Sequence, residues 1–392
     1  MSTSNAVDTI PQHDFSGSAT ELMSLAITQA RTAFGRVAPN PAVGAVIARD
    51  GVVIATGATR PPPGPHAEIV ALTVAGEAAR GADLFVTLEP CAHFGRTPPC
   101  VNAIIDAGIR RVVVAMLDPN PVVDGRGVEQ LRAAGIAVEI GLLTDEAQEA
   151  IAGFTKRIRT GRPLVTAKYA MTLDGRIATR IGHSRWISGP ESREHVHLLR
   201  DRVDAILVGS GTVLADDPLL TTRIPDQLAG YGGAHHPLRV VLDRNAHMSP
   251  NSRMLEADTP GQTLIATGRE APESSIRALE ATGAEIVRLN GDLGSVLDFL
   301  GTRGVNDLLV EGGAGIHGAF FDSRLVDRVR VYLTPSIVGG GCAPSPVGGR
   351  GVATMPEAVR IVDQRVTQFG NDLCIEGRVV YPEEVADVQR DR

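Results

Sequence analysis

Short apolar runs alternate with amphipathic stretches along most of this chain, and that alternation is typical of α/β proteins. After Ser18 and Glu21, which form a possible helix-capping box, leucine and alanine recur at helical spacing up to Ala33. The pattern then predicts strands at residues 43–47, 52–56, 84–88, 112–116 and 136–140. It predicts helices at about residues 66–79, 100–107, 128–134 and 144–159. Because strands and helices alternate, we expect a layered domain with helices on both faces of one sheet.

A second α/β series follows Gly161-Arg162-Pro163, which ends the last of those helices. Its strands are expected at residues 164–170, 205–208, 239–242, 263–266, 286–289, 307–310, 329–333 and 373–380, and its helices at 191–200, 272–281 and 293–300. The segment Gly339–Gly351 is dense in glycine, which predicts a loop that is mobile or makes a close approach. We therefore expect a disordered tail at residues 1–18, one domain at 19–160 and another at 161–392.

Composition and charge exclude several classes of protein. The chain has 392 residues, of which 43% are hydrophobic and 21% charged, as in an ordinary globular protein of two or three domains. No stretch approaches the roughly 18 uninterrupted apolar residues of a membrane helix, and the polar N-terminus is not a secretory signal. A net charge of −7 argues against a general nucleic-acid binder. Four cysteines do not make a disulfide framework in so long a chain. We therefore expect the protein to work in the reducing cytoplasm.

One imidazole, two thiols and one carboxylate stand in an order that indicates zinc chemistry. His66, Cys91 and Cys100 each follow a proline directly, and Glu68 lies two residues beyond His66. Zinc binds imidazole and thiolate readily, and a catalytic zinc keeps an open position for a water whose pKa it lowers to roughly 7. H-x-E followed by P-C and a second cysteine is the pattern of zinc-dependent base deaminases, in which the glutamate moves protons. Each residue alone would more often be a packing residue, but all four in this order predict a zinc site with Glu68 as proton shuttle.

Two glycine-rich turns follow strands in the second series, at residues 209–211 and 312–318. The second turn fits G-x-G-x-x-G between a strand and a helix, which suits backbone amides that hold a phosphate, and a bland tight turn is the alternative. The polar run Thr212–Pro218 lies between Arg200 and Arg223. It could belong to a phosphate pocket or form a solvated turn.

These motifs closely resemble one known enzyme family, the bifunctional riboflavin-biosynthesis deaminase/reductases. The deaminase half is similar at residues 39–44, 66–68 and 87–100, and the reductase half at 173–176, 184–187, 212–218 and 310–313. The eight residues between Cys91 and Cys100 separate this branch from cytidine deaminases, which have two. The resemblance covers nearly everything after Ser18. It implies a cytidine-deaminase-like three-layer α/β domain followed by a dihydrofolate-reductase-like α/β domain.

The resemblance also implies a two-step reaction with Zn²⁺ and NADPH. The first half would deaminate 2,5-diamino-6-(5-phosphoribosylamino)pyrimidin-4(3H)-one, and the second would reduce its ribosyl chain to give 5-amino-6-(5-phosphoribitylamino)uracil. The deaminase positions are His66, Cys91 and Cys100 for zinc, Glu68 for catalysis and Asn40 for the pyrimidine. The cofactor positions are Ala170, Trp186, Thr212, Asp216, Gly313, Ala314, Gly315, Ile316, His317, Gly318 and Ala319. The substrate positions of the reductase are Ser184, Arg200, Leu220, Arg223 and Glu311, with the arginines suited to a phosphate.

Two rival functions and two single residues stay open. One rival is a deaminase of free nucleosides or tRNA with an inert second domain; the other is a zinc-stabilised sensor of a flavin precursor and NADPH. His93 could close the zinc site as a fourth ligand, although we favour a substrate-side or loop role. Arg244 stands where family members can carry serine, and it could meet the 2′-phosphate of the cofactor or face water. As partners we expect a small phosphorylated pyrimidine, no nucleic acid and no membrane, with a homo-oligomeric assembly.

Overall fold

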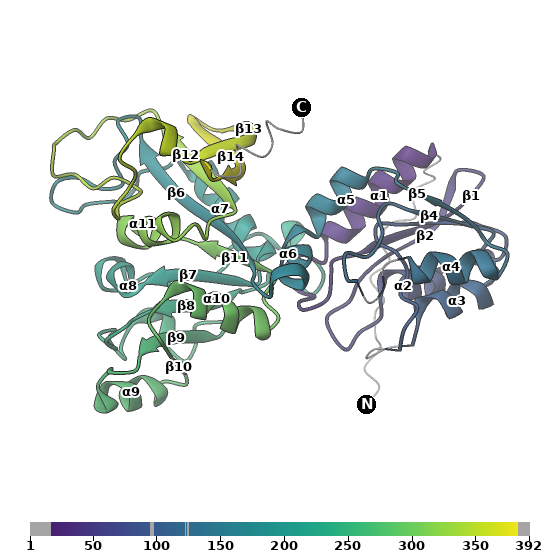
Figure 1. Ribbon diagram of the computed structural model, residues 1–392, viewed down its shortest axis with the longest axis horizontal. Coiled ribbons are helices and arrows are strands. Elements are labelled where there is room, and N and C mark those ends of the chain that lie inside the picture. The colour runs from purple at the N-terminus through teal and green to yellow at the C-terminus, as the bar shows by residue number, and fades with distance from the viewer. Residues whose placement is uncertain (1–16, 95–97, 122, 124, 383–392) are drawn as a thin grey trace. The chain divides into compact units, whose positions relative to one another are not determined.

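The computed structural model describes residues 17–94, 98–121, 123 and 125–382 of the chain. It divides into two compact units, Met1–Arg159 and Thr160–Arg392 (Figure 1). Most of the tail expected at residues 1–18 lies outside the described residues, but Gly17 donates its backbone N–H to Gly51. No helix in the described part of the chain is long and apolar enough to cross a membrane.

The first unit contains a five-stranded sheet in the order β2-β1-β3-β4-β5, in which β1 is antiparallel to both neighbours and β3, β4 and β5 are parallel. The strands are β1 (Gly44–Arg49), β2 (Val52–Ala58), β3 (Asp83–Val86), β4 (Arg111–Val114) and β5 (Ala137–Ile140). The helices are α1 (Ala19–Arg31), α2 (Ala67–Ala75), α3 (Cys100–Asp106), α4 (Arg126–Ala133), α5 (Thr144–Ala150) and α6 (Ala152–Thr160). The capping box expected at the start of α1 is present, with Ser18 and Glu21 as its members.

Helices α1 and α2 cover opposite faces of this sheet, and two glycines make their close approach possible. A Cβ on Gly44 would lie 1.8 Å from the Ala26 carbonyl oxygen of α1, and a Cβ on Gly57 would lie 2.3 Å from the Ala67 carbonyl oxygen of α2. Gly57 is paired with Ala45, the neighbour of Gly44, and successive residues of a strand point to opposite faces. The expected arrangement, with helices on both faces, is therefore confirmed.

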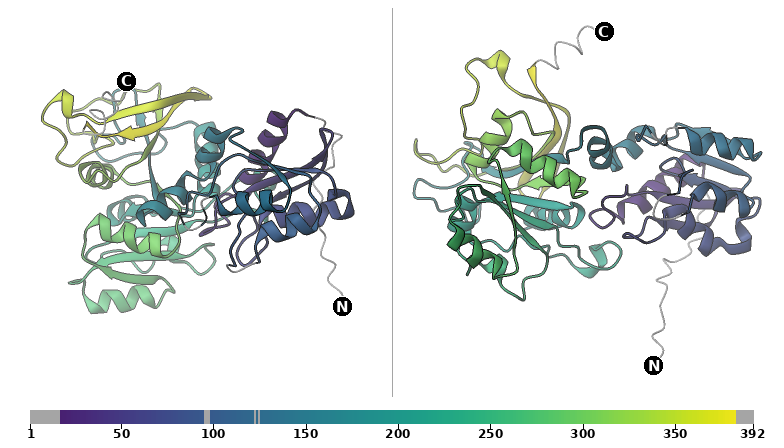
Figure 2. Two further views of the ribbon diagram at one scale, coloured as in Figure 1. Left: turned by 45° about the vertical axis from the view of Figure 1, so that its right-hand side comes forward. Right: turned by 60° about the horizontal axis from the view of Figure 1, so that its bottom comes forward.

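The second unit contains a nine-stranded sheet in the order β10-β9-β8-β7-β11-β6-β12-β14-β13, parallel from β10 to β12 and antiparallel beyond. The strands are β6 (Leu164–Thr172), β7 (Ala205–Gly209), β8 (Leu238–Leu242), β9 (Thr263–Gly268), β10 (Glu285–Leu289), β11 (Asp307–Val310), β12 (Arg328–Thr334), β13 (Arg360–Phe369) and β14 (Asp372–Val380). The helices are α7 (Pro190–Arg202), α8 (Ser210–Asp216), α9 (Glu273–Glu280), α10 (Leu293–Thr302) and α11 (Ala314–Asp322). Figure 2 shows the β13–β14 hairpin in yellow at one end of this unit.

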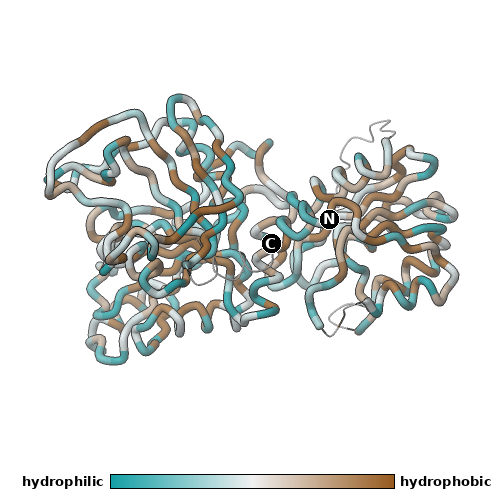
Figure 3. The backbone as a smooth tube through the Cα atoms, turned by 45° about the horizontal axis from the view of Figure 1, so that its top comes forward, coloured by the Kyte–Doolittle hydropathy of each residue, from teal (hydrophilic) through white to brown (hydrophobic). Residues whose placement is uncertain are grey.

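Apolar residues of the central strands and of the helices packed on them form the cores of both units, and Figure 3 shows many hydrophobic (brown) stretches in both parts of the chain. β3, β7 and β9 are buried along their whole lengths, as expected for parallel strands covered on both faces.

The structure corrects the expected elements in three places. The helix expected at 144–159 is two helices, α5 and α6, because Ile151 leaves helical geometry between them with φ −117° and ψ 22°. The polar run after Gly209, interpreted as a turn, is mostly the short helix α8. Strand β13 was not expected at all. The loop at Gly339–Gly351 does make a close approach: a Cβ on Gly318 of α11 would lie 2.4 Å from the Gly348 carbonyl carbon.

Candidate active sites

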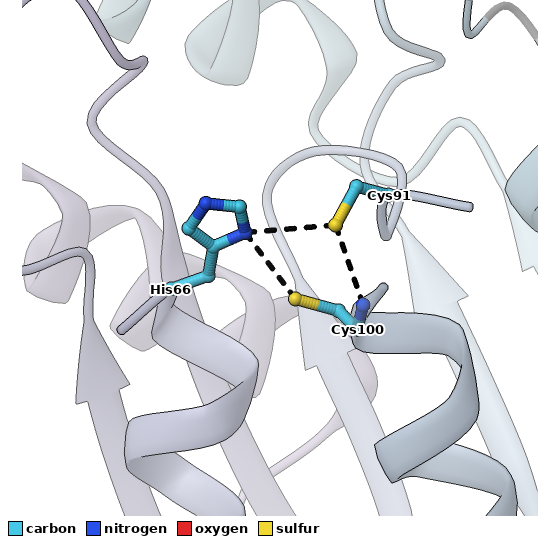
Figure 4. Close-up of side chains that lie close together, drawn as sticks. All are labelled: His66, Cys91 and Cys100. Atoms are coloured by element: carbon cyan, nitrogen blue, oxygen red, sulfur yellow. Dashed lines mark hydrogen bonds between the residues drawn. The ribbon is translucent and has the colours of Figure 1, made fainter. Parts of the chain in front are cut away.

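His66, Cys91 and Cys100 converge on one point in the first unit (Figure 4). The Nδ1 atom of His66 lies 3.6 Å from Cys91 Sγ and 3.3 Å from Cys100 Sγ, and the three ligand atoms all lie within 4.8 Å of one another. With Zn–N of about 2.0 Å and Zn–S of about 2.3 Å, tetrahedral zinc holds such atoms roughly 3.5 Å apart. The donor set and its spacing therefore fit one zinc ion with three protein ligands, which leaves a fourth coordination position free.

Two of these ligands, His66 and Cys100, lie at the N-termini of helices. His66 is the N-cap residue of α2, and Cys100 is the first residue of α3. The Cys100 backbone N–H donates to Cys91 Sγ at 3.3 Å. Hydrogen bonding between the two thiols lowers the pKa of Cys91 and raises the pKa of Cys100, so the pair favours a thiolate on Cys91.

Cys91 belongs to no helix or strand, and a buried carboxylate next to it holds its loop. Glu89, which is 3% exposed, accepts four backbone N–H bonds: Oε1 from Gly127 (2.8 Å) and Val128 (3.2 Å), and Oε2 from Gly125 (2.9 Å) and Asp118 (3.2 Å). These amides include the beginning of α4, where a negative charge is favoured. A Cβ on Gly127 would lie 2.0 Å from the Pro90 carbonyl oxygen, so the two segments also pack closely.

Glu68 lies in the first turn of α2 and is 4% exposed. Burial raises the pKa of Glu68 to about 7, and the nearby Cys91 charge adds to that effect. The carboxyl group therefore exchanges a proton easily at neutral pH, as a general acid–base catalyst must.

His93 and Asn40 are not among these three ligand residues. His93 is exposed, and the metal-competent group among the described residues contains only His66, Cys91 and Cys100. Asn40 lies in the turn before β1, where its backbone N–H donates to the Val37 carbonyl. Residues 95–97 of the cysteine loop lie outside the described residues.

In the second unit the strand order brings distant residues together at one edge of the sheet. β11 inserts between β7 and β6, so the segments that follow these three parallel strands adjoin one another. Glu311 directly follows β11, and its backbone N–H donates to Leu207 of β7. Ligands of open α/β sheets bind at such carboxyl ends.

One carboxylate joins two cations at this edge. Arg200 donates two parallel hydrogen bonds to Glu311, of 2.8 and 2.9 Å, and a third of 3.3 Å to the Thr221 carbonyl. Lys168 Nζ lies 3.6 Å from Glu311, and these three side chains are only 8–15% exposed. Burial alone would raise the pKa of Glu311, but the Arg200 and Lys168 charges outweigh it and hold that pKa at about 2. Because one carboxylate faces two buried cations, the cluster keeps a net positive charge.

Arg223 extends this positive region, and a neutral histidine, His197, lies beside it. Burial, together with the charges of Arg200 and Arg253, lowers the pKa of Arg223. Burial of His197, together with the charges of Arg200 and Arg223, lowers the pKa of His197 to about 4. This imidazole is therefore neutral at physiological pH. A surplus of arginine and lysine around one carboxylate suits an anionic substrate such as a phosphate ester.

The two glycine-rich turns serve both packing and access. A Cβ on Gly209 would lie 2.7 Å from Ile316, and one on Gly312 would lie 2.6 Å from the same side chain, so both glycines admit Ile316 over the strand ends. Gly211 and Gly315 have no atom within 4 Å of a built Cβ. Near the N-termini of α8 and α11 these two positions are open, which suits the approach of a cofactor phosphate to backbone amides.

The other expected reductase residues are distributed around this edge. Trp186 is 71% exposed, with the Arg193 guanidinium 4.7 Å above its ring, and the Ser184 hydroxyl lies 3.5 Å from the Asp216 carboxylate. A Cβ on Gly313 would lie 3.8 Å from the Thr212 hydroxyl, which places α8 beside α11.

Two expected contact residues point their side chains inward. His317 is fully buried and stacks edge-on against Tyr169 at 5.3 Å, and Leu220 is 4% exposed, with a left-handed backbone at φ 54°. Both side chains lie in the protein interior.

Sequence reasoning missed Glu89, Lys168 and His197. Lys168 had a visible signal, because it is the single charge in the apolar run Leu164–Thr172, and a buried charge needs a reason. Glu89 belongs to the cysteine motif, but the sequence alone assigns it no role. His197 had no signal beyond its position one helical turn before Arg200.

Two protein-family models match different parts of the chain. Residues 17–116 match the family of cytidine and deoxycytidylate deaminase zinc-binding regions, and residues 163–375 match the RibD C-terminal domain. The chain is 40% identical to the riboflavin biosynthesis protein RibD of Aquifex aeolicus, over 90% of this chain and 96% of that protein. It is 40% identical to the Escherichia coli protein of the same name, over 86% of this chain and 93% of that protein.

Solved structures give the same result. RibD of Acinetobacter baumannii superposes with a TM-score of 0.83 at 35% identity, over 92% of this chain and 98% of that one. A Thermotoga maritima protein named diaminohydroxyphosphoribosylaminopyrimidine deaminase/5-amino-6-(5-phosphoribosylamino)uracil reductase superposes with a TM-score of 0.80 at 36% identity, over the same shares of the two chains.

Fold and site together define a zinc-dependent deaminase joined to a reductase. More particularly, the chain belongs to the RibD family of riboflavin biosynthesis proteins. The expected fold class, the bifunctional activity and the use of zinc and NADPH are thereby confirmed.

Proposed function

We propose that the first unit hydrolyses the 2-amino group of 2,5-diamino-6-(5-phosphoribosylamino)pyrimidin-4(3H)-one and that the second reduces the ribosyl chain of the product. The observation that carries the proposal is the buried Glu68 beside His66, Cys91 and Cys100, because this arrangement serves hydrolysis and no structural site needs it. The name of the Thermotoga maritima relative supports the substrate pair.

In the deaminase, three side chains would hold zinc and a fourth would move protons. Zinc, when bound, supplies a water acidified to a pKa of about 7. Glu68 would move the proton, taking it up from the attacking water and passing it to the departing amine, and its pKa of about 7 allows transfer in both directions. Glu89 holds the Cys91 loop in place, and Asn40 orients the pyrimidine.

In the reductase, the positive cluster would bind and orient the phosphorylated substrate. NADPH, when bound, supplies the hydride. Arg223, which is the more exposed of the two arginines, binds the substrate phosphate, and Arg200 is fixed by its paired bonds to Glu311. The open positions at Gly211 and Gly315 give the cofactor pyrophosphate access to the helix N-termini.

Two substitutions separate catalysis from metal binding in the deaminase. Glu68→Gln keeps the side-chain shape and leaves all three zinc ligands intact, so zinc content and thermal stability should stay near wild type. Deamination should fall by at least the roughly 10²–10⁴-fold that general acid–base groups supply. Cys100→Ser should lose zinc together with deaminase activity, because serine is a far poorer zinc ligand.

Zinc analysis and a coupled assay, which follows NADPH oxidation with the diamino substrate supplied, measure these effects. Both variants should still reduce deaminated substrate, which serves as the internal control. A Glu68→Gln protein with full zinc and full deaminase activity would rule out the proton shuttle. Efficient deamination of cytidine, adenosine or tRNA by the wild type would favour the rival substrate class.

We also propose that the enzyme works in the cytoplasm as a homo-oligomer. All four cysteines are free thiols, which suits a reducing compartment. The loops after β6 and β12 hydrogen-bond to each other, with Leu173 N–H donating to Ser336, and together they expose Ile181 and Ile337. Exposed apolar groups of this kind favour a contact with a second copy. Cell fractionation and light scattering of the purified chain check both points.

A further inference from the structure

A cavity of about 180 Å³ opens where β8, β9 and β10 end, outside the residues assigned above to either site. Its lining includes Arg244 after β8, Arg269 after β9 and Asn290 after β10. All three strands are parallel, so these residues follow the same edge of the sheet at which Glu311 and the glycine-rich turns lie.

The backbone holds Arg244 in a fixed position. The Asp243 carboxylate accepts the Met248 N–H at 2.7 Å and its carbonyl accepts the Ala246 N–H at 3.0 Å, which closes a tight turn. The Arg244 carbonyl accepts the Gly268 N–H at 2.8 Å, which ties the end of β8 to the end of β9.

Two glycines leave room for the Arg244 side chain to cross the neighbouring strand ends. A Cβ on Gly268 would lie 3.1 Å from Arg244 Cγ, and a Cβ on Gly291 would lie 3.2 Å from Arg244 Nη2. The stem of Arg244 therefore passes the end of β9, and its guanidinium lies against the backbone just beyond β10.

The charges of this cavity are not balanced internally. Over the described part of the chain, neither the Arg244 nor the Arg269 guanidinium makes a hydrogen bond or an ion pair with the protein. One carboxylate, Glu270, also lines the cavity, and Asn245 and Asn290 add amide donors. Two unpaired guanidinium groups with amides beside them are the donors that bind a phosphate monoester.

The cavity adjoins the place proposed for the cofactor pyrophosphate. Gly209, at the start of α8, is the register partner of Leu242, two residues before Arg244. From the end of β11, where α11 begins, β8 is two strand spacings away, about 10 Å. A dinucleotide with its pyrophosphate at α8 and α11 would thus extend its adenosine toward Arg244.

We propose that Arg244 and Arg269 bind the 2′-phosphate of NADPH and make this reductase prefer NADPH over NADH. This inference rests on the proposed placement of the cofactor. From the sequence alone, Arg244 could either contact the 2′-phosphate of the cofactor or face water. We assign it the phosphate contact.

Equilibrium titration of the full-length protein with 2′,5′-ADP and with 5′-AMP tests the proposal without turnover. Arg244→Ala and Arg269→Ala should each weaken 2′,5′-ADP binding about ten- to a hundredfold, since each removes charge-assisted bonds to phosphate. Binding of 5′-AMP should be unchanged. Glu270→Gln should tighten 2′,5′-ADP binding, because it removes a repulsive charge from the cavity. Arg288→Ala, an exposed arginine of β10 that is paired with Glu273, is the matched control.

The outcomes separate this inference from the proposed function. If the wild type binds and oxidises NADPH but the variants bind 2′,5′-ADP as tightly as it does, the phosphate lies elsewhere and the inference fails. If both nucleotides weaken equally, the arginines support the adenosine pocket or the fold, and the inference fails as well. A wild type that binds neither NADPH nor 2′,5′-ADP would overturn the proposed placement of the cofactor itself. Should an arginine variant not fold, Glu270→Gln still decides through the sign of its effect.

Discussion

Glu89 binds backbone rather than metal, yet it determines where a zinc ligand stands. Three of its four N–H partners belong to the segment that begins α4 and the fourth is Asp118, while Cys91 is only two residues away in a loop without regular structure. Glu89→Gln replaces one acceptor oxygen by a donor NH₂ that would face backbone N–H groups. We expect faster zinc loss to a chelator, with metal affinity lower by the 10- to 100-fold typical of residues that support metal ligands.

The control for this prediction is Glu139→Gln, which changes an exposed carboxylate of the same unit that pairs with Arg111. Deaminase activity should follow zinc content in Glu89→Gln, while reduction of deaminated substrate stays at the wild-type rate. Unchanged zinc release in Glu89→Gln would show that the loop holds Cys91 without this carboxylate.

Arg200 and Arg223 should respond differently to the same substitution. Arg200 donates two direct hydrogen bonds to the buried Glu311, and without them only Lys168, 3.6 Å away, still faces that carboxylate. Breaking a buried pair completely typically costs about 3–5 kcal/mol, so Arg200→Ala should cost up to that amount. Arg200→Ala should therefore lower the melting temperature as well as the reductase activity. Arg223→Ala leaves no buried charge unpaired, so it should raise KM for the phosphorylated substrate about ten- to a hundredfold with little change in stability.

Thermal melts and steady-state kinetics measure both variants, with NADPH affinity as the shared reference. Arg253→Ala, a neighbouring exposed arginine, should leave stability and KM near wild type. Equal loss of substrate and NADPH binding in Arg223→Ala would mean that Arg223 supports the cofactor or the fold instead of the phosphate.

At the residue scale, the site residues that could be predicted are those whose types and order along the sequence indicate their chemistry. His66, Cys91 and Cys100 could be found because zinc requires these residue types, and Glu68 because a shuttle must stand beside them. Glu89 and Lys168 could not be assigned roles, because their partners are backbone amides and a distant carboxylate that only the fold brings near.

At the scale of elements, periodic apolar runs were enough to place most of the strands and helices. Strand β13 was not predicted because its residues are mostly exposed and polar. It lies at the edge of the sheet and pairs only with β14. Its register also shifts between Val362 and Arg365, which breaks the two-residue alternation. Helix α8 was not predicted because it is only seven residues long. It has a glycine near its start and is followed by Asp217-Pro218, a combination that is typical of a turn.

The order of strands could not be read from the sequence. Chain order places β11 after β10, yet it inserts between β7 and β6, which follow one another in the chain. That insertion brings Glu311 to Arg200 and Lys168, so the proposed substrate site of the reductase depends on a long-range pairing. Hydrophobic periodicity is a local signal and holds no information about such pairing.

At the scale of the whole molecule, each unit has a hydrophobic core of its own. Among the described residues, the buried members of the first unit's core cluster lie between Leu22 and Phe154, and those of the second unit's clusters lie between Val165 and Tyr381. The chain passes from one to the other at the end of α6. Gly161 already packs in the second unit, since a Cβ on Gly301 of α10 would lie 1.7 Å from its carbonyl oxygen.

The two units should therefore fold and work separately. A fragment of residues 161–392 keeps Gly161 and the paired bonds of 2.6 and 3.1 Å from Arg162 to Asp298, and its length is within the range of about 50–250 residues of single domains. It should unfold cooperatively and oxidise NADPH when given deaminated substrate, at a rate close to that of the full chain. A fragment of residues 1–160 should bind about one zinc and deaminate the diamino substrate.

A fragment that begins at Leu164 is the matched control, because it lacks both Gly161 and Arg162 and should melt at a lower temperature than the 161–392 fragment. Circular dichroism melts, zinc analysis and the two half-reaction assays measure these expectations. A 161–392 fragment that is insoluble, or folded but inactive, would mean that the halves share a core or a catalytic group. An active reductase fragment beside a deaminase fragment that has zinc but no activity would place part of the deaminase site in the second unit, and only the deaminase assignment would then need revision.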